Sequence, residues 1–552
     1  MFKFRSGYFY MLAVGFVLFR FIKQLYFATS FYNKSLKTKT PEQFYFYPNP
    51  YLLSSFISRK NFSFELTKIN PENFWNSGKN QKKKKDLHSF FWLNLINRKN
   101  DNEIIQKIIL IWISKNTRFN NRNWQNLNIS KRVLAWMLNA DIILSHANIS
   151  FKKQFFNSII TQVNHLKKNI NYENDPRKKI EIISVIILSG LVFKEYNSNF
   201  EIGLKLLKNV VEEFFNIDGS PKSRSIYDLV QCSKFLILVK ECCKDAQEYI
   251  PDYLDDIVQK LVDCVFSLQT STQKNPLFNG ASEFETDSYL EYLKGLDYNS
   301  KEIKDKIADI YIARSKKTLL FFDAGSPPKK IFSNNYQSGP LSFEYFFQGK
   351  KIITNCGYGN KISPKIELIS RLTSAQSTLT LNDTSVVKFE NNNLTSKVFG
   401  TAIASSFEVY DFKAEEENNY ITICAKHNGY KKKFNYIHER LLRINKGNQN
   451  LLGEDILTTN KNKYNDSDNI YNIRFHLYPG ITAVQTMAKN SILIQIEKNK
   501  SLIFKTSGEN LHLEKSIFLG RNQIVNNFCI TISGTLTKNE NKHIKWELLK
   551  NN

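Results

Sequence analysis

The pattern of apolar residues changes its character a little beyond the middle of the chain. Up to about residue 300, apolar residues recur at the spacing of amphipathic helices. Stretches with this spacing are, in chain order, Glu103–Lys115, Lys131–Ala140, Ile180–Phe193, Ile202–Phe215, Ile226–Lys240 and Leu254–Leu268. Successive helices of similar length predict helical hairpins packed in an array or a ring.

From Leu319 onward, short runs alternate apolar and polar residues, as in half-buried strands. Examples are Lys351–Thr354, Thr378–Leu381, Tyr420–Ile423 and Ser491–Ile496. Turn residues recur between the runs, including Asn382–Asp383, and "EKNK" at 497–500 predicts a hairpin connection. The pattern predicts an antiparallel β-sandwich of many strands. We place a helical domain at residues 41–312 and the β domain at 313–552.

Residues 1–40 form a separate N-terminal segment. Lys3 and Arg5 precede an apolar run from Tyr8 to Phe19, which Arg20 and Lys23 then interrupt. The run is short for a membrane span, and no clean cleavage site follows it. Three interpretations stay open: a secretory signal, a basic helix on a membrane surface over Tyr8–Phe27, and a helix packed on the rest of the protein.

Composition adds a strong positive charge, +26 at neutral pH with an isoelectric point near 9.5. Such a surface attracts polyanions. Lys far outnumbers Arg, and Asn and Ile are abundant, so we attribute most of the excess to AT-rich coding. No nucleic-acid-binding module accompanies the charge, so nucleic acid is not a predicted partner. The seven cysteines show no zinc spacing and imply no disulfide framework.

Several stretches resemble the heparinase II/III-like family, in a branch common in alphaproteobacteria. In the β half they are "FFDAGSPP" (Phe321–Pro328), "NYQSGPLSFEY" (Asn335–Tyr345), "IITNCGYG" (Ile352–Gly359), "RLTSAQSTLTLNDTS" (Arg371–Ser385), "HERLLRINKGNQNLLGEDIL" (His438–Leu457) and "RFHLYPGITA" (Arg474–Ala483). In the helical half they are "LHSFFWLNLI" (Leu87–Ile96), "ISKRVLAWML" (Ile129–Leu138), "NIDGSPKSRS" (Asn216–Ser225) and "LFNGASE" (Leu277–Glu283). The resemblance implies an incomplete α/α toroid followed by a β-sandwich, with the active site in the cleft between them. It also implies a lyase acting on uronic-acid polymers.

The resemblance also points to positions for a metal site. The family places histidines before the "LSFE" strand, an aspartate after the next strand and a histidine in an "R-x-T-x-x-H-x-T" stretch. In this chain Asn335 takes the position of the first, potentially catalytic histidine. The zinc positions fall on Gln337, Asn355 and Gln376. Amides are poor zinc ligands, so no metal cofactor is predicted.

Two interpretations of these amides remain open. They can bond to one another and to the backbone, as a neutral replacement that keeps the strands in register. Alternatively, their amide donors bind a substrate carboxylate, which makes Gln337 and Gln376 substrate-binding residues.

Three further residues are candidates for the site. Arg224 either pairs with a uronate carboxylate or bonds to nearby carbonyls at a helix start. Asn279 either binds substrate or serves the Asn–Gly turn. Tyr336 is the preferred acid or base because it lies inside the retained motif, ahead of Tyr289 and Tyr292.

These residues lead to one functional prediction and one alternative. The prediction is a lyase that cleaves an acidic, uronate-containing glycan by β-elimination, with Tyr336, Asn335 and Arg224 as catalytic residues. The alternative is a glycan-binding or cell-envelope protein on the same fold with a lost metal site. The resemblance implies the cell envelope or periplasm, while a cytoplasmic or membrane-peripheral location stays open.

Overall fold

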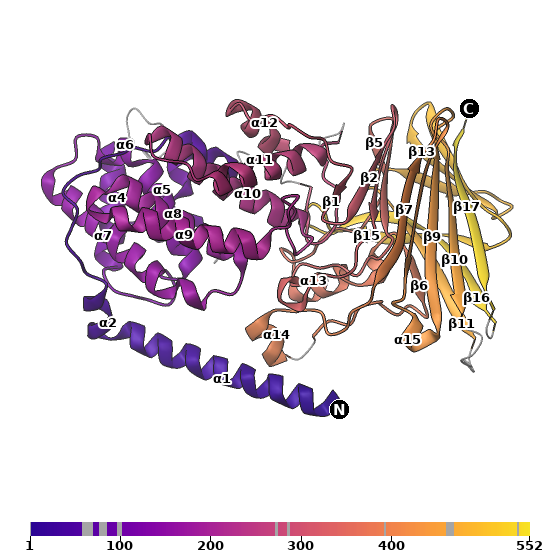
Figure 1. The fold of residues 1–552 in the computed structure, drawn as a ribbon, viewed down its shortest axis with the longest axis horizontal. Coiled ribbons are helices and arrows are strands. Elements are labelled where there is room, and N and C mark those ends of the chain that lie inside the picture. Colours follow the sequence, from indigo (N-terminus) through magenta and orange to yellow (C-terminus); the bar gives the residue numbers. More distant parts are fainter. Residues whose placement is uncertain are drawn as a thin grey trace. The chain divides into compact units, whose positions relative to one another are not determined.

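A computed structural model describes residues 2–57, 70–76, 86–96, 102–270, 274–283, 287–390, 393–459, 468–537 and 540–551 (Figure 1). The chain divides into two compact units, each described by itself below. Unit 1 comprises Met1–Phe215 and Gln231–Leu261, and unit 2 comprises Asn216–Val230 and Val262–Asn552. The four-lysine run at 82–85 lies outside the described residues.

Unit 1 is built from helices, which follow the apolar spacing of the sequence. Its described helices are α1 (Phe2–Ala28), α2 (Ser30–Ser35), η1 (Pro50–Phe56), η3 (Phe74–Asn76), η4 (Phe91–Leu95), α4 (Asn102–Lys115), α5 (Asn126–Leu138), α6 (Ala140–Leu144), α7 (Ile149–Asn169), η5 (Ile170–Tyr172), α8 (Pro176–Val192), η6 (Lys194–Tyr196) and α9 (Asn197–Phe214). Helices α10 (Ile226–Asp245) and α11 (Asp252–Ser267) each run from one unit into the other.

Helix α8 forms the centre of unit 1. It starts where Asp175 caps the amide of Arg177 and Pro176 fixes the first helical residue. Every residue from Ile180 to Val192 is buried, because the helix is hydrophobic nearly all round. It packs against α5, α7 and α9.

Unit 2 is built mainly from strands. They are β1 (Lys306–Ile307), β2 (Ile310–Arg314), β3 (Thr318–Asp323), β4 (Phe343–Phe347), β5 (Lys350–Thr354), β6 (Leu379–Leu381), β7 (Val409–Glu416), β8 (Tyr420–His427), β9 (Tyr436–Asn445), β10 (Leu451–Thr459), β11 (Asn469–Leu477), β12 (Thr482–Gln485), β13 (Ser491–Glu497), β14 (Lys500–Thr506), β15 (Asn510–Phe518), β16 (Val525–Leu536) and β17 (Lys542–Asn551). The helix α12 (Asp287–Gly295) precedes the strands, and short helices lie between them: η7 (Lys330–Phe332), α13 (Pro364–Ser370), η8 (Thr373–Ala375), α14 (Asn393–Phe399) and α15 (Lys431–Phe434).

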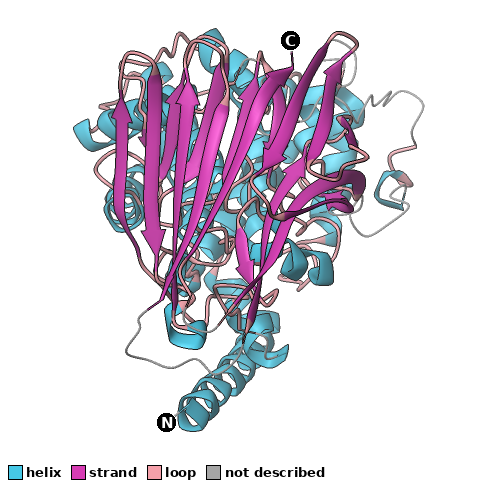
Figure 2. Cartoon of the chain, turned by 90° about the vertical axis from the view of Figure 1, so that its right-hand side faces the viewer, coloured by secondary structure: helices cyan, strands magenta, loops and turns pink. Residues whose placement is uncertain are grey.

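The described strands form two antiparallel sheets (Figure 2). The first has the order β1-β2-β3-β4-β5-β11-β16-β15, with β6 paired to β11. The second has the order β12-β13-β14-β17-β10-β9-β8-β7. Aromatic side chains from both sheets meet in one core: Phe343 of β4 stacks on Trp546 of β17 with ring centroids 5.7 Å apart. Burying one such ring stabilises the fold by about 2–3 kcal/mol.

The predicted fold class is confirmed: a helical region precedes an antiparallel, sheet-rich region with two sheets. The hairpin predicted at "EKNK" joins β13 to β14. Asn382 and Asp383 both have left-handed backbone angles, φ 47° and 48°, as a tight hairpin turn requires.

The N-terminal helix α1 carries an apolar stretch that is long enough to cross a membrane. Tyr10–Ala28 has a mean hydropathy of 1.5, and only 11% of the window is buried. The last turn of α1 belongs to unit 1, because Phe27 packs against Tyr32, Phe119 and His165.

Candidate functional site

Arg224 lies in unit 2, just before α10, and its side chain is bound on all sides by protein groups. Its guanidinium donates to the carbonyls of Ala308 (3.0 Å), Gly325 (3.1 Å) and Ser326 (3.0 Å). It also forms a short ion pair with Asp323, which is equally buried. Burial lowers the pKa of Arg224, but the charges of Asp323, Tyr336 and Asp309 and the hydrogen bond to Asp323 together outweigh burial and raise the pKa overall. The guanidinium therefore links the residues before α10 to the segments around Ala308 and Asp323–Ser326.

Asn279 and Gly280 form the predicted turn and connect Arg224 to Gln337. Both residues have left-handed backbone angles, φ 49° and 90°. The Asn279 side chain donates to the carbonyl of Arg224 (3.1 Å) and accepts from the amide of Gln337 (3.2 Å). The amide of Gly280 donates to Oε1 of Gln337 (3.0 Å). Asn279 thus serves the turn and also joins two parts of the site.

Gln337 and Gln376 meet at one backbone carbonyl. Nε2 of Gln337 donates to the carbonyls of Ser370 (2.8 Å) and Gly357 (3.1 Å). Nε2 of Gln376 donates to the same Ser370 carbonyl at 2.9 Å. Both side chains are almost fully buried. Two amides from separate segments therefore hold the end of α13 in place.

Asn355 completes this set from the end of β5. Its Oδ1 accepts from the amide of Ser377, next to Gln376, at 2.9 Å. Its own backbone amide donates to Glu344 on β4 (2.9 Å). Glu344 in turn forms a fully buried ion pair with Lys351 at 2.7 Å. The three positions predicted from the family's zinc site thus gather around residues 370–377.

The donor set of these three residues does not suit a zinc ion. Amide groups are weak zinc ligands, and here they bond to the backbone at each of the three positions. Within the described ranges, no group of three or more His, Cys, Asp or Glu side chains is arranged to hold a metal. The hydrogen bonds fit the interpretation in which the amides keep the strand ends in register.

Tyr336 is the only candidate with an unsatisfied polar atom. The side chain is 0% exposed, and its hydroxyl has no hydrogen bond of regular geometry among the described residues, although the Arg224 guanidinium lies close enough to lower its pKa as a hydrogen-bond donor. It lies near the charges of Arg224 and Asp323. Burial first, and then Asp323, raise the pKa of the phenol, which stays protonated at neutral pH. Tyr289 and Tyr292 are buried too, and they stack on each other in α12 with centroids 5.8 Å apart.

Asn335 differs from the other candidate residues because its side chain is half-buried. Its Nδ2 donates to Oδ1 of Asp228 at 3.2 Å. Asp228 also accepts from the hydroxyl of Ser223 at 2.7 Å. Asn335 is therefore the candidate whose polar group is most accessible.

The sequence analysis did not identify Arg371, which holds the segment of Tyr336 through hydrogen bonds to backbone carbonyls. Its guanidinium donates to the carbonyls of Tyr336 (2.8 Å), Ser333 (2.9 Å) and Thr401 (2.5 Å). The available signal was its place at the start of the "RLTSAQ" motif. The motif shows that Arg371 matters, but not which carbonyls it reaches, since those lie 30 to 38 residues away.

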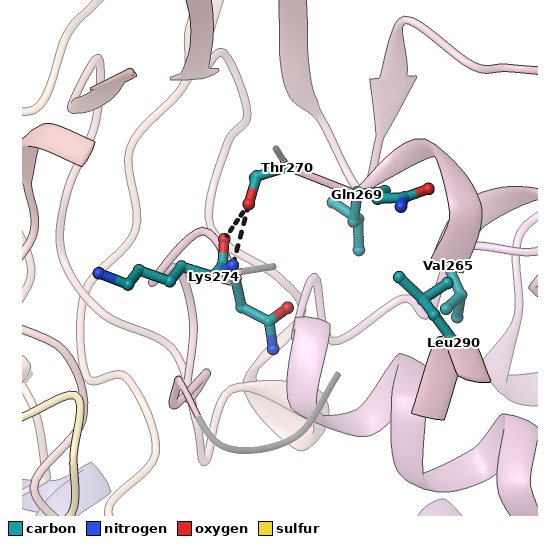
Figure 3. Close-up of a pocket in the computed structure, with 7 residues that line it drawn as sticks. Val265, Gln269, Thr270, Lys274 and Leu290 are labelled. Atoms are coloured by element: carbon teal, nitrogen blue, oxygen red, sulfur yellow. Dashed lines mark hydrogen bonds between the residues drawn. The ribbon is translucent and has the colours of Figure 1, made fainter. Parts of the chain in front are cut away.

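A small cavity lies beside this region in unit 2, lined partly by Val265, Gln269 and Leu290 (Figure 3). It closes where Thr270 bonds to the carbonyl and amide of Lys274, both at 2.9 Å. The volume is about 10 Å³, which suits a single water molecule. The Lys274 ammonium extends away from it, over the ring of Tyr478 at 4.1 Å. This cavity is too small for a sugar.

The helical region, the two antiparallel sheets and this set of positions form the arrangement expected of a polysaccharide-lyase family. The family model "Heparinase II/III N-terminus" matches residues 59–302, and "Heparinase II/III-like, C-terminal" matches residues 307–547. The chain belongs to the heparinase II/III-like family.

Solved structures share this fold. A crystal structure of heparinase III aligns with 14% identity over 94% of this chain and 88% of that one, with a TM-score of 0.69. Heparan sulfate lyase HepC from Pedobacter heparinus aligns with 14% identity over 94% and 87%, with a TM-score of 0.65. The heparinase III BT4657 gene product has 14% identity over 89% and 87%, with a TM-score of 0.66. No match is found among curated protein sequences.

Proposed function

We propose that this chain is a lyase that acts on an acidic, uronate-containing polysaccharide without a metal ion. Family membership over both halves supports polysaccharide-lyase-like chemistry. The net charge of +26, although attributed above mostly to AT-rich coding, would still attract an anionic polymer. The amides at the family's zinc positions, all bonded to backbone, support a reaction without zinc.

The reaction would be a β-elimination. A base takes the C5 proton of the uronate, the bond from C4 to the glycosidic oxygen breaks, and a C4–C5 double bond forms. An acid protonates the leaving oxygen. We assign this acid to Tyr336, and the observation that carries the assignment is its buried hydroxyl beside Arg224, which lacks a hydrogen bond of regular geometry. An unsatisfied buried polar group costs about 1–3 kcal/mol, which a functional role would explain.

The other candidate residues take supporting roles in this proposal. Asn335 offers its half-exposed amide to the uronate carboxylate, whose negative charge grows as the C5 proton leaves. Arg224 is a positioning residue, because its donors are bound to Asp323 and to carbonyls. Gln337, Asn279 and Gln376 hold the strand ends beneath the site.

A second candidate function is glycan binding without cleavage. The full burial of Tyr336 favours it, because an acid must reach the leaving oxygen. β-Elimination also needs a base, and Asp323, the carboxylate close to Tyr336, is paired with Arg224. The amide set would then mark a metal site that has been lost while the fold was kept.

The deciding experiment follows the ultraviolet absorbance of the unsaturated uronate product. The full chain is incubated with polygalacturonate, alginate and heparan sulfate, with and without EDTA. We expect product on at least one polymer and no effect of EDTA. Tyr336→Phe should lower the rate by about 10²–10⁴-fold. Tyr345→Phe is the matched control: it removes another buried hydroxyl, which bonds to the carbonyl of Gln449, and should leave the rate unchanged.

The outcomes separate the two candidates. Equal rates in Tyr336→Phe and Tyr345→Phe would remove Tyr336 from the reaction. Product formation that EDTA abolishes would contradict the metal-free proposal. Measurable binding of a polymer without any product would establish the second function in place of the first.

We also propose that α1 attaches the protein to a membrane in the cell envelope. Large apolar side chains are exposed along the helix, including Met11, Leu18 and Ile22. The packing of Phe27 in unit 1 supports a helix that is kept in the working protein, because its loss would open an aromatic core. An apolar helix of this length suits attachment to lipid.

A further inference from the structure

Unit 1 contains a larger open cavity, of about 380 Å³. It lies where the C-terminal end of α4 meets the following loop, with η3 and the segment around His88 on the other side. We call it the tryptophan pocket, after Trp75 and Trp112 in its lining. Its volume falls in the range of about 300–1,000 Å³ that is typical of small-molecule sites.

Aromatic rings form one wall of the tryptophan pocket. Trp75 lies flat on His88, with centroids 5.1 Å apart and planes 12° apart. The indole N–H of Trp112 donates to Nδ1 of His88 at 3.0 Å, which places the imidazole proton on Nε2. Burial, followed by the charges of Arg132 and Arg122, lowers the pKa of His88 to about 4. The wall is therefore uncharged at neutral pH and offers a ring N–H donor.

A second donor in this wall lacks an acceptor. The indole N–H of Trp75 is buried and bonds to no protein group in the described part of the chain. Such a donor is costly unless a ligand or water accepts from it. Flat rings with N–H groups at their edges are well suited to sugars, whose C–H faces pack on rings and whose hydroxyls accept hydrogen bonds.

The pocket is also strongly positive. Beneath it, Arg132 is fully buried, with its guanidinium 4.1 Å from the ring centroid of Trp112. Its hydrogen bonds go to neutral groups: the side chain of Gln162 (2.7 Å) and the carbonyls of His88 (3.3 Å) and Asn123 (3.1 Å). Burial lowers the pKa of Arg132 to about 9, and no carboxylate among the described residues offsets this effect. A buried cation without a counter-charge is expensive and attracts an anion.

Two more cations lie at the mouth of the pocket. Lys115 and Arg122 both line it and are exposed, and neither forms an ion pair among the described residues. No acidic side chain lines the pocket in the described part of the chain. The positive charge is therefore available to a ligand.

Amides hold the loop that carries Arg122. Oδ1 of Asn116 accepts from the side chains of Asn120 (2.9 Å) and Asn123 (2.8 Å). Oδ1 of Asn120 accepts from the backbone amide of Asn123 (2.8 Å). These bonds span residues 116–123, so the pocket is formed before a ligand arrives and binding costs little ordering entropy.

We propose that the tryptophan pocket binds an acidic sugar residue of a glycan chain, with the sugar ring against Trp75 and its anionic group toward Arg122 and Lys115. The aromatic wall suits the sugar ring, and the cations suit its anionic group. A nucleic acid is disfavoured because the pocket is a single compact site and not an extended basic track. The site belongs to the helical unit and needs no cleavage, so it stands independently of the lyase proposal.

The test is calorimetric titration of the full chain in a neutral detergent. The probes are tetragalacturonate, a heparin tetrasaccharide, neutral maltotetraose and inorganic sulfate. We expect binding of one or both acidic oligosaccharides, and at least about tenfold weaker binding of maltotetraose and sulfate. Arg122→Gln should weaken oligosaccharide binding about tenfold, the value of one charge-assisted hydrogen bond. Arg118→Gln removes the same charge from the same loop, outside the lining, and should bind as the unaltered protein does.

Trp75→Phe provides a second variant, since it keeps a ring but removes the unpartnered N–H. It should weaken binding of the acidic oligosaccharide several-fold, with an unchanged far-ultraviolet spectrum. Equal losses in Arg122→Gln and Arg118→Gln would show a non-specific charge effect and overturn the proposal. So would sulfate binding as tightly as the acidic sugars, which would show a simple anion site. Binding that survives in a chain without lyase product would uphold the pocket while the lyase proposal fails.

Discussion

Arg224 shows how closely single residues are fitted in unit 2. Its backbone is left-handed, with φ 58°, which costs a residue with a Cβ about 1 kcal/mol or more. The guanidinium recovers this cost through Asp323 and three carbonyls. A Cβ added at Gly325 would overlap the guanidinium carbon, so only glycine fits there.

Gly325→Ala should therefore destabilise unit 2 by about 3 kcal/mol, because the guanidinium cannot move without breaking a buried ion pair. Denaturant unfolding measures this change. Gly447→Ala is the control, since its added Cβ would meet only Asn445 Oδ1 at 3.3 Å, and it should change the free energy of unfolding by less than about 0.5 kcal/mol. Equal effects of the two substitutions would show that Arg224 is not held as described.

At the scale of single residues, the sequence indicated which positions belong to the candidate site better than it indicated their hydrogen-bond partners. Motifs pointed to Arg224, Gln337 and Gln376, and the structure joins all three through Asn279 and Ser370. The acceptor carbonyls were not predictable, because Ala308 and Gly325 lie 84 and 101 residues from Arg224. The sequence also did not show that the amide side chains of the site are buried, because Asn and Gln occur on surfaces and, when hydrogen-bonded, in cores.

Among the elements, periodicity predicted most of the long helices and two hairpin turns, but it missed α7 (Ile149–Asn169), whose many Lys, Asn and Gln residues dilute the apolar pattern. Helix α4 begins one residue before the predicted Glu103 and ends at Lys115 as predicted. Strand β8 shows the strict alternation of buried and half-buried residues that its sequence suggested. The short helices α13, α14 and α15 were missed because four to seven residues are too few for a helical period to show.

Helix α1 gives a prediction at the scale of an element. Leu18 and Ile22 are 56% and 62% exposed, so replacing both with Asp should lower binding to phosphatidylglycerol-containing vesicles at least tenfold. Co-sedimentation with vesicles measures this binding. Ile149→Asp is the control, because Ile149 is 86% exposed but lies on α7. Undiminished binding of the double variant would assign the membrane contact to another surface.

Across the whole molecule, buried histidines make stability depend on pH. Burial lowers the pKa of His165 to about 3 and that of His476 to about 4, and it also lowers the pKa of His427 and His438. Below the ordinary histidine pKa near 6.5, these histidines bind protons in the unfolded chain but stay neutral in the folded chain. The free energy of unfolding must then fall as the pH drops. The loss affects both units and begins well before the carboxylates titrate.

Between pH 7 and 5.5, each fully buried histidine should remove about 1 kcal/mol from the free energy of unfolding. Denaturant titrations at steps of pH measure the slope. His476→Asn should flatten it by the share of one histidine, even if the variant is less stable throughout. His512→Asn is the control, because His512 is exposed on β15. A stability that rises toward pH 5.5 would contradict the buried, neutral state of these rings.

The amides around residues 370–377 have a consequence for how the protein matures. A site built from metal ligands exists in loaded and empty forms, and the cell must supply the ion before the fold is complete. Gln337, Asn355 and Gln376 bring their partners with them in the same polypeptide. Under the metal-free proposal, the sheet-rich unit would reach its final form in zinc-rich and zinc-starved surroundings alike, with no delivery step to wait for.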